Sequence, residues 1–129
     1  MVKIAIVEDE EAIAEMYKIK MLQAGYEVGV ASNGHEGLAL CEQMKPDLVL
    51  LDLMMPEMNG DEMLEKMRST DWGKEPLVLV LTNLSQHESE IDPVREPVDG
   101  YAVKAYYTPT QLLDKVNEIL KENGKLPKD

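Results

Sequence analysis

The chain has 129 residues, 44% of them hydrophobic, and its 25 Asp and Glu against 13 Lys and Arg give a formal net charge of −12. This length and apolar content predict one folded domain rather than a disordered chain. The acidic excess argues against direct nucleic-acid binding, which needs clustered basic side chains, and no apolar run approaches the roughly 20 residues of a membrane span. A lone cysteine and the lack of an export signal predict a cytoplasmic location.

Five short, mostly apolar runs predict β-strands. In chain order they cover residues 3–7, 26–31, 47–51, 76–81 and 100–103. Three of them are too uniformly apolar to have a solvated face, which is typical of parallel strands covered on both sides.

Helical patterns separate these runs. The first, over 11–24, precedes Gly25 and carries apolar residues near helical spacing: Ala12, Ile13, Met16, Ile19 and Leu22. Shorter patterns cover 33–45 and 59–69, and the last begins with Thr108 as N-cap and Pro109 at the first helical position. Strands that alternate with helices predict an α/β fold with a parallel sheet covered on both faces.

Polar residues stand where four of the predicted strands end. They are Glu8, Asp9, Asp52, Thr82 and Lys104. Any one of them alone would be read as a solvated loop residue. Because the carboxyl ends of parallel strands lie along one edge, where open α/β sheets bind ligands, the set predicts a shared site.

The residue types at this edge favour phosphoryl chemistry. Three carboxylates repel one another unless a cation compensates, and oxygen ligands without nearby Cys or His suit Mg²⁺. The acidic first loop would repel a bound nucleotide phosphate, whereas Lys104 and Thr82 can donate to phosphoryl oxygens. A carboxylate between a metal site and a lysine suits a nucleophile that accepts a phosphoryl group, and Asp52 has that place.

Across nearly its whole length the chain resembles the receiver domain of two-component response regulators. The resemblance rests on the acidic pair in "IVEDE", the D-x-x-M-P-x-x-x-G spacing of "LLDLMMPEMNG", the threonine that closes "LVLVLT", and "DGYAVK". It implies a flavodoxin-like sheet of five strands in a (βα)5 arrangement. It also implies that Asp52 is phosphorylated by a sensor histidine kinase or phosphotransfer protein.

The resemblance assigns roles to the other residues of the site. Mg²⁺ would be held by Glu8, Asp9, Asp52 and the backbone carbonyl of Met54. Thr82 and Lys104 would bind the phosphoryl group.

Three further positions follow from the same resemblance. Thr82 and Tyr101 would form the conformational switch. Met54 and Leu84 would border the phosphoryl group and set the rate of its hydrolysis. The only reactions expected of the chain itself are its own Mg²⁺-dependent phosphorylation and dephosphorylation.

Several residues depart from the family pattern. Glu8 stands where aspartate is commoner, Ala105 where a cis proline usually follows the lysine, and Asn83 where a small residue is usual. Pro93 and Pro97 fall in or beside the expected fourth helix, which is therefore predicted to be short or irregular.

Two other functions stay open at this stage. An interaction module that works without phosphorylation is the main alternative, although all five edge residues are intact. A phosphatase of the haloacid dehalogenase type would need aspartate where Met54 stands.

The resemblance predicts a receiver domain over 1–124, with 125–129 as a tail or the start of a linker. The output partner or fused domain is not readable from the sequence, and a homodimer stays open.

Overall fold

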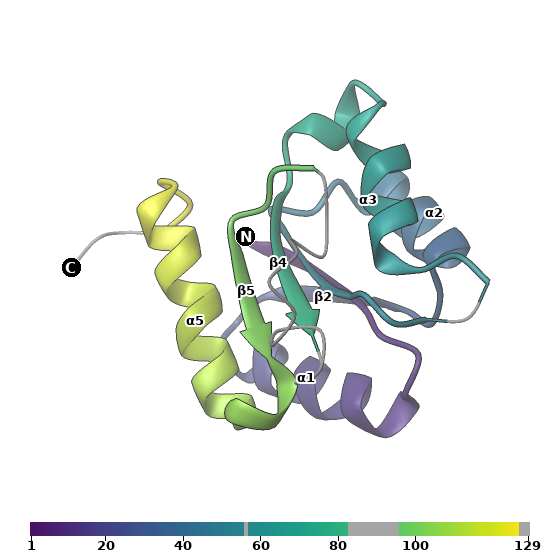
Figure 1. Ribbon diagram of the computed structural model, residues 1–129. Coiled ribbons are helices and arrows are strands. Elements are labelled where there is room, and N and C mark those ends of the chain that lie inside the picture. The colour runs from purple at the N-terminus through teal and green to yellow at the C-terminus, as the bar shows by residue number, and fades with distance from the viewer. Residues whose placement is uncertain (56, 83–95, 127–129) are drawn as a thin grey trace.

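The computed structural model describes residues 1–55, 57–82 and 96–126, and these residues contain one five-stranded parallel sheet (Figure 1). Its strands are β1 (Lys3–Val7), β2 (Glu27–Ala31), β3 (Leu48–Asp52), β4 (Leu77–Thr82) and β5 (Gly100–Val103). They lie in the order β2-β1-β3-β4-β5, so the chain reverses its direction of travel across the sheet after β2. This confirms the predicted flavodoxin-like α/β class, and it places the switch point between β1 and β3.

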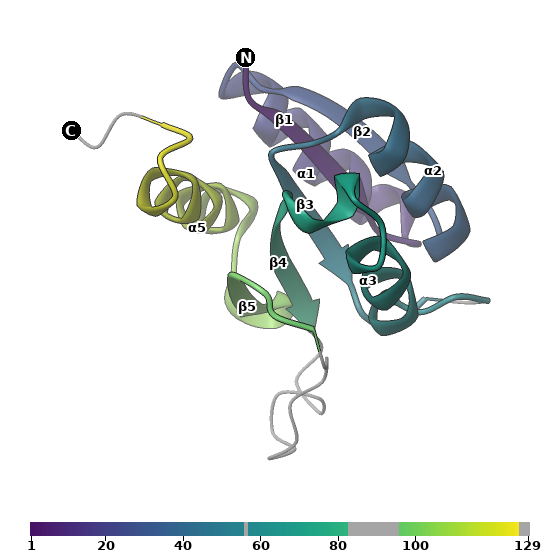
Figure 2. The same cartoon turned by 90° about the horizontal axis from the view of Figure 1, so that it is seen from above.

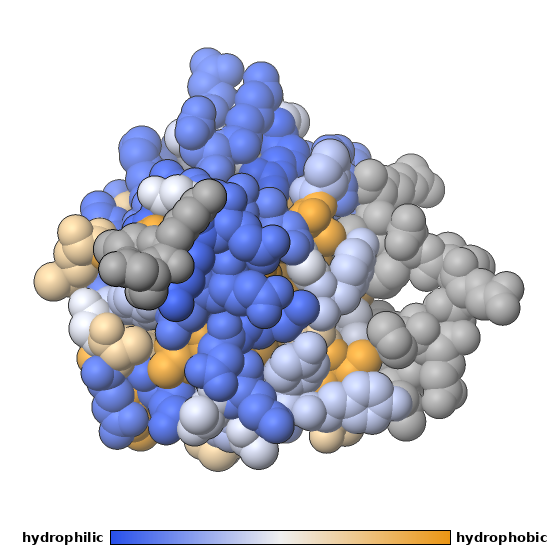
Figure 3. All heavy atoms as spheres, turned by 90° about the vertical axis from the view of Figure 1, so that its left-hand side faces the viewer, coloured by the Kyte–Doolittle hydropathy of each residue, from blue (hydrophilic) through white to orange (hydrophobic). Residues whose placement is uncertain are grey.

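Helices cover both faces of the sheet. In Figure 1, α5 lies to the left of the sheet and α2 and α3 to the right, and Figure 2 shows the same layers from above. One face packs against α1 (Glu11–Gln23) and α5 (Pro109–Glu122), and the other packs against α2 (Gly34–Met44) and α3 (Gly60–Arg68). The outer side of α5 belongs to a face on which hydrophilic residues predominate (Figure 3).

Strand β3 shows why the central strands are uniformly apolar. Leu48 and Leu50 join the core under α1 and α5, whereas Val49 and Leu51 join the core under α2 and α3. All four are fully buried, because successive strand residues point to opposite faces and both faces are covered. Each such side chain contributes roughly 1.5–3 kcal/mol on burial, so Asp52 stands at the end of a well-anchored strand.

Side-chain caps fix where three helices begin. Asn33 and Asn59 accept hydrogen bonds from the N–H groups of Glu36 and Glu62, at the starts of α2 and α3. At the start of α5, the predicted cap Thr108 forms a reciprocal capping box with the third residue of the helix. The cap of α2 stands two residues after the end of β2, so the loop between them at the carboxyl edge is short.

Helix α1 forms as predicted, but its apolar residues do not all face the sheet. The buried residues are Ala14, Tyr17 and Met21. Met16, Ile19 and Leu22 lie on the solvent side, with 49%, 47% and 48% of their surface exposed. These apolar residues correctly predicted the helix, but they form an outward-facing stripe.

Carboxylates at the amino edge of the sheet serve the backbone. Asp47 accepts the N–H of Lys3 at 2.8 Å, and Asp99 accepts the N–H of Val78, also at 2.8 Å. These side chains therefore satisfy backbone N–H groups at the starts of β1 and β4.

Other expectations have simple outcomes. Cys41, the one cysteine of the chain, is fully buried in the core under α2 and α3. The expected fourth helix falls within residues 86–100, of which 86–95 lie outside the described part of the chain. No helix in the described ranges is long and apolar enough to cross a membrane.

Candidate functional site at the carboxyl edge of the sheet

The structure brings the predicted edge residues together. Asp52 and Thr82 are the last residues of β3 and β4, Glu8 and Asp9 follow β1, and Lys104 follows β5. Because β1 and β4 pair on either side of β3, their ends flank Asp52. Five residues spread over nearly a hundred positions of sequence therefore meet at one edge.

Lys104 is the cation of this cluster. Its Nζ lies 2.7 Å from Oε1 of Glu8 and 3.1 Å from Oδ2 of Asp52. The two carboxylate side chains are 0% and 4% exposed, and the lysine side chain is 21% exposed. Although burial disfavours its charge, these two carboxylates raise the pKa of Lys104 above its ordinary value. The lysine is therefore a cation held by two buried anions.

The environment of Asp52 makes its charge costly. Burial, together with the nearby charge of Glu8, raises the pKa of Asp52 to about 7, although Lys104 opposes the shift. Its other oxygen, Oδ1, accepts a hydrogen bond from the N–H of Met54 at 3.3 Å. Further positive charge at this site would therefore be favourable at neutral pH.

The acidic residues can hold a metal ion. One carboxylate oxygen from each of Glu8, Asp9 and Asp52 lies within 4.8 Å of the other two. Three oxygen ligands with a net negative charge, and no sulfur or imidazole among them, fit a hard cation such as Mg²⁺. The three carboxylates predicted to bind the metal are therefore close enough to act together.

Thr82, the last residue of β4, brings a hydroxyl group to the same edge of the sheet. Its side chain is buried, and its hydroxyl has no hydrogen-bond partner among the described residues. An unsatisfied buried hydroxyl costs about 1–3 kcal/mol, so a ligand oxygen at this position would recover that energy.

Three other predicted residues have different outcomes. Tyr101 is partly buried and packs against the core under α2 and α3. Met54 has 57% of its surface exposed beside Asp52, whereas Leu84 lies outside the described residues, as does Asn83. The described chain contains no cis peptide bond, so Lys104 and Ala105 are joined in trans.

The structure adds residues that the sequence pattern did not single out. Tyr17 of α1 is buried close enough to feel the charges of Lys104, Glu8 and Asp52, and its pKa is raised chiefly by burial. The backbone N–H of Glu10 donates to Oε2 of Glu8 at 3.1 Å. In the sequence, Tyr17 has no feature that distinguishes it from other helix residues. The hydrogen bond from the Glu10 N–H depends on backbone geometry, which the sequence does not specify.

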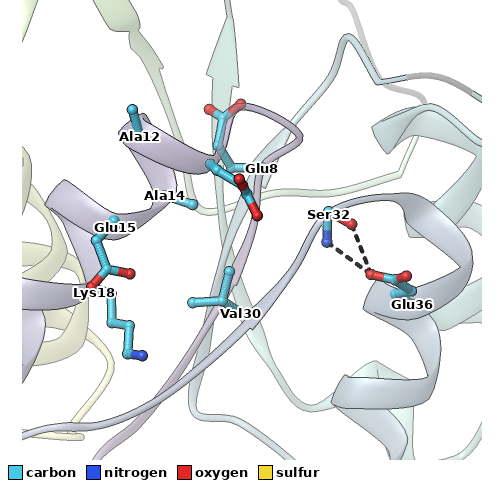
Figure 4. Close-up of a pocket in the computed structure, with 9 residues that line it drawn as sticks. Glu8, Ala12, Ala14, Glu15, Lys18, Val30, Ser32 and Glu36 are labelled. Carbon is cyan, nitrogen blue, oxygen red and sulfur yellow. Dashed lines mark hydrogen bonds between the residues drawn. The ribbon is translucent and has the colours of Figure 1, made fainter.

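A hollow of roughly 580 Å³ opens between α1, the end of β2 and the start of α2 (Figure 4). Glu8, which belongs to the acidic cluster with Asp9 and Asp52, lines this hollow together with Val30 of β2. On the far side, Ser32 donates to Glu36 from both its N–H and its hydroxyl, at 3.2 and 2.8 Å. The hollow is predominantly acidic, with Lys18 as its one cation.

The family follows from a comparison with known sequence families. The family model for the response regulator receiver domain matches residues 4–117. The chain is a response regulator receiver domain.

Relatives of this receiver domain include transcriptional regulators. It is 32% identical over 127 residues to the DNA-binding dual master transcriptional regulator RpaA of Synechocystis, covering 98% of this chain and 52% of that protein. It is also 32% identical over 124 residues to the alkaline phosphatase synthesis regulator PhoP of Bacillus subtilis, covering 94% of this chain and 49% of that protein. The chain thus spans about half the length of these relatives.

Solved receiver structures have the same fold. The chemotaxis response regulator CheY4 of Vibrio cholerae matches with a TM-score of 0.81 and 30% identity, over 93% of this chain and 99% of that one. The response regulator TrrA of Thermotoga maritima, solved in complex with Mg²⁺ and BeF, matches with a TM-score of 0.77 and 32% identity, over 93% of this chain and 100% of that one.

Proposed function

We propose that this receiver domain accepts a phosphoryl group on Asp52 from a phosphohistidine, in the cytoplasm. The observation that carries the proposal is the position of Asp52, whose buried carboxylate lies beside Glu8 and Lys104 at the carboxyl edge. In the transfer, an Asp52 oxygen forms a bond to phosphorus as the phosphorus–nitrogen bond breaks and the imidazole leaves. This reaction depends mostly on positioning and charge neutralisation.

The neighbouring residues would support the transfer from fixed positions. Lys104 would place its ammonium against the phosphoryl oxygens, and Thr82 would donate its unpartnered hydroxyl to one of them. Glu8, Asp9, Asp52 and the carbonyl of Met54 would hold Mg²⁺, which would neutralise part of the phosphoryl charge. The complex of TrrA with Mg²⁺ and BeF supports this assignment.

The expected readout is a conformational change. A bond to the Thr82 hydroxyl would draw the end of β4 toward Asp52, and Tyr101 of β5 lies in register with Val80 of β4. We propose that Thr82 and Tyr101 transmit the change to an output domain or partner. The DNA-binding activity named for RpaA supports a transcriptional output in a longer protein.

The first prediction tests the acceptor and the need for a metal ion. Incubation with acetyl phosphate and Mg²⁺ is expected to add one phosphoryl group, which peptide mapping by mass spectrometry should place on Asp52. With EDTA in place of Mg²⁺ the adduct should fall below detection, because the carboxylates would repel the donor. An adduct that forms equally well in EDTA, or that maps to another residue, would contradict the proposal. The absence of any adduct would favour an interaction module that works without phosphorylation.

We also propose that a helical phosphohistidine protein docks on α1. This helix begins two residues after Asp9, at the edge where the imidazole must arrive, and its outward stripe of Met16, Ile19 and Leu22 runs from there. The acidic hollow of Figure 4 borders the same helix, so a partner with an apolar stripe and basic flanks fits this surface.

The second prediction separates docking from chemistry. For a histidine kinase that phosphorylates the wild-type domain, Ile19→Lys is expected to slow phosphotransfer by about tenfold. The reason is that the lysine places a charge at the centre of an apolar contact. Phosphorylation by acetyl phosphate should be unchanged, since that donor needs no docking surface. Ala39→Lys, at an exposed position of α2, adds the same charge elsewhere and should leave both rates unchanged. Equal kinase rates for Ile19→Lys and wild type would refute this docking face.

A further inference from the structure

The tightest ion pair of the site does not involve the proposed acceptor. Lys104 Nζ lies 2.7 Å from Glu8 and 3.1 Å from Asp52, so Glu8 is its nearer partner. The Glu8 side chain is 0% exposed, which removes competition from water for this contact. The Lys104 ammonium, which is proposed to bind the phosphoryl group, is thus held chiefly by Glu8, the residue that follows β1.

Glu8 is already engaged through both of its oxygens. Oε1 forms the ion pair with Lys104 at 2.7 Å, and Oε2 accepts the backbone N–H of Glu10 at 3.1 Å. The same carboxylate belongs to the cluster of Glu8, Asp9 and Asp52 that can hold a metal ion. An ammonium and a divalent cation on one buried carboxylate repel each other strongly, since the low-dielectric surroundings screen them poorly.

We propose that Lys104 and Mg²⁺ compete for Glu8, so that Glu8 acts as a positioning residue. It holds the ammonium until the ion binds and then releases it toward the phosphoryl oxygens. The length of the side chain matters, because an aspartate would end about one carbon–carbon bond, ~1.5 Å, short of Lys104. This inference rests on the metal site of the proposed function.

The test is a double-mutant cycle read by Mg²⁺ affinity, measured by calorimetry on the whole chain. The four proteins are the wild type, Glu8→Asp, Lys104→Met and the double variant. Lys104→Met is expected to tighten Mg²⁺ binding about tenfold in the wild-type background but less than about threefold in the Glu8→Asp background. Glu8→Asp alone should tighten binding by about threefold or more, because the shorter carboxylate no longer holds the lysine.

Lys18→Met provides the control for the general electrostatic field. Lys18 lines the same hollow as Glu8, and the described residues show no ion pair between the two. Its removal should tighten Mg²⁺ binding by no more than about twofold. A gain equal to that of Lys104→Met would overturn the inference, because the effect would then be one of net charge.

The remaining outcomes separate this inference from the proposed function. If Lys104→Met has the same effect in both backgrounds, or none, competition for Glu8 is refuted while Mg²⁺-dependent phosphorylation stands. If none of the proteins binds Mg²⁺, both the inference and the proposed metal site fail.

Discussion

Asp52→Asn is expected to abolish phosphorylation and yet to stabilise the fold at pH 8. The variant lacks the nucleophilic oxygen, so no adduct should form with acetyl phosphate and Mg²⁺. It also removes a buried charge, because Asp52 is 4% exposed and its pKa is raised from 3.8 to about 7 by burial and by Glu8. In the wild type Lys104 has a second, shorter contact to Glu8, at 2.7 Å, and this contact should remain in the variant.

The pH dependence has a definite sign. Between pH 4 and 7 the folded wild type binds the Asp52 proton more tightly than the unfolded chain does. The free energy of unfolding of the wild type therefore falls as pH rises through this window. Above pH 7 the folded state bears the full cost of ionising the buried Asp52. At about 1.4 kcal/mol per pKa unit the gain of Asp52→Asn at pH 8 should be about 2–4 kcal/mol, shrinking toward pH 5.

Urea denaturation at pH 8 and at pH 5.5, without divalent ions, measures this difference. Asp47→Asn is the matched control at the amino edge, where the carboxylate accepts the N–H of Lys3 and pairs with Lys125. It should bring no gain at either pH. A loss of stability in Asp52→Asn at pH 8 would show that the ion pair with Lys104 outweighs the cost of burying the charge.

Gly60→Ala is expected to damage both the fold and the site. A Cβ at position 60 would lie 2.4 Å from the backbone carbonyl oxygen of Asp52 and 3.0 Å from Cα of Leu53. These are backbone atoms at the end of β3, so the contact is relieved only if α3 or the end of β3 moves. Overpacking of this kind costs about 1–3 kcal/mol, and displacement of Asp52 should slow phosphorylation by acetyl phosphate by about tenfold.

Gly100→Ala controls for the loss of a glycine. The nearest atoms to its Cβ would be side-chain atoms of Ile119 and Leu79, at 3.2 and 3.3 Å, and of Lys115, at 3.7 Å, which can move slightly. Urea midpoints and phosphorylation rates of the two variants provide the comparison. If Gly60→Ala matches Gly100→Ala in both, the close approach of α3 to Asp52 does not constrain the site.

The elements and the site were largely predictable because their causes are local or periodic. Asp52 and Thr82 end runs of buried residues, so the topology of a parallel sheet alone brings them to one edge. Thr108 and Pro109 mark a helix start by their own chemistry. Such features are determined by residues that are close in sequence, so they can be predicted from the sequence alone.

What could not be predicted depends on contacts between distant segments. The apolar residues of α1 indicated a helix, but the side that faces the sheet is set by how Ala14, Tyr17 and Met21 fit against β1 and α5. Likewise, Glu8 could be placed near a metal site, yet its preference for Lys104 depends on distances across the sheet. Both outcomes require the packed structure.

The position of Cys41 has a practical consequence. Its thiol is fully buried in the core under α2 and α3, and burial raises its pKa to about 12, so almost no thiolate exists near neutrality. Alkylating reagents and oxidants act on the thiolate and need access to it. Because the chain has one cysteine, every modified molecule records one opening of that core. The rate at which a thiol reagent adds its mass to the folded protein therefore reports how readily this core opens, without any probe having to be engineered.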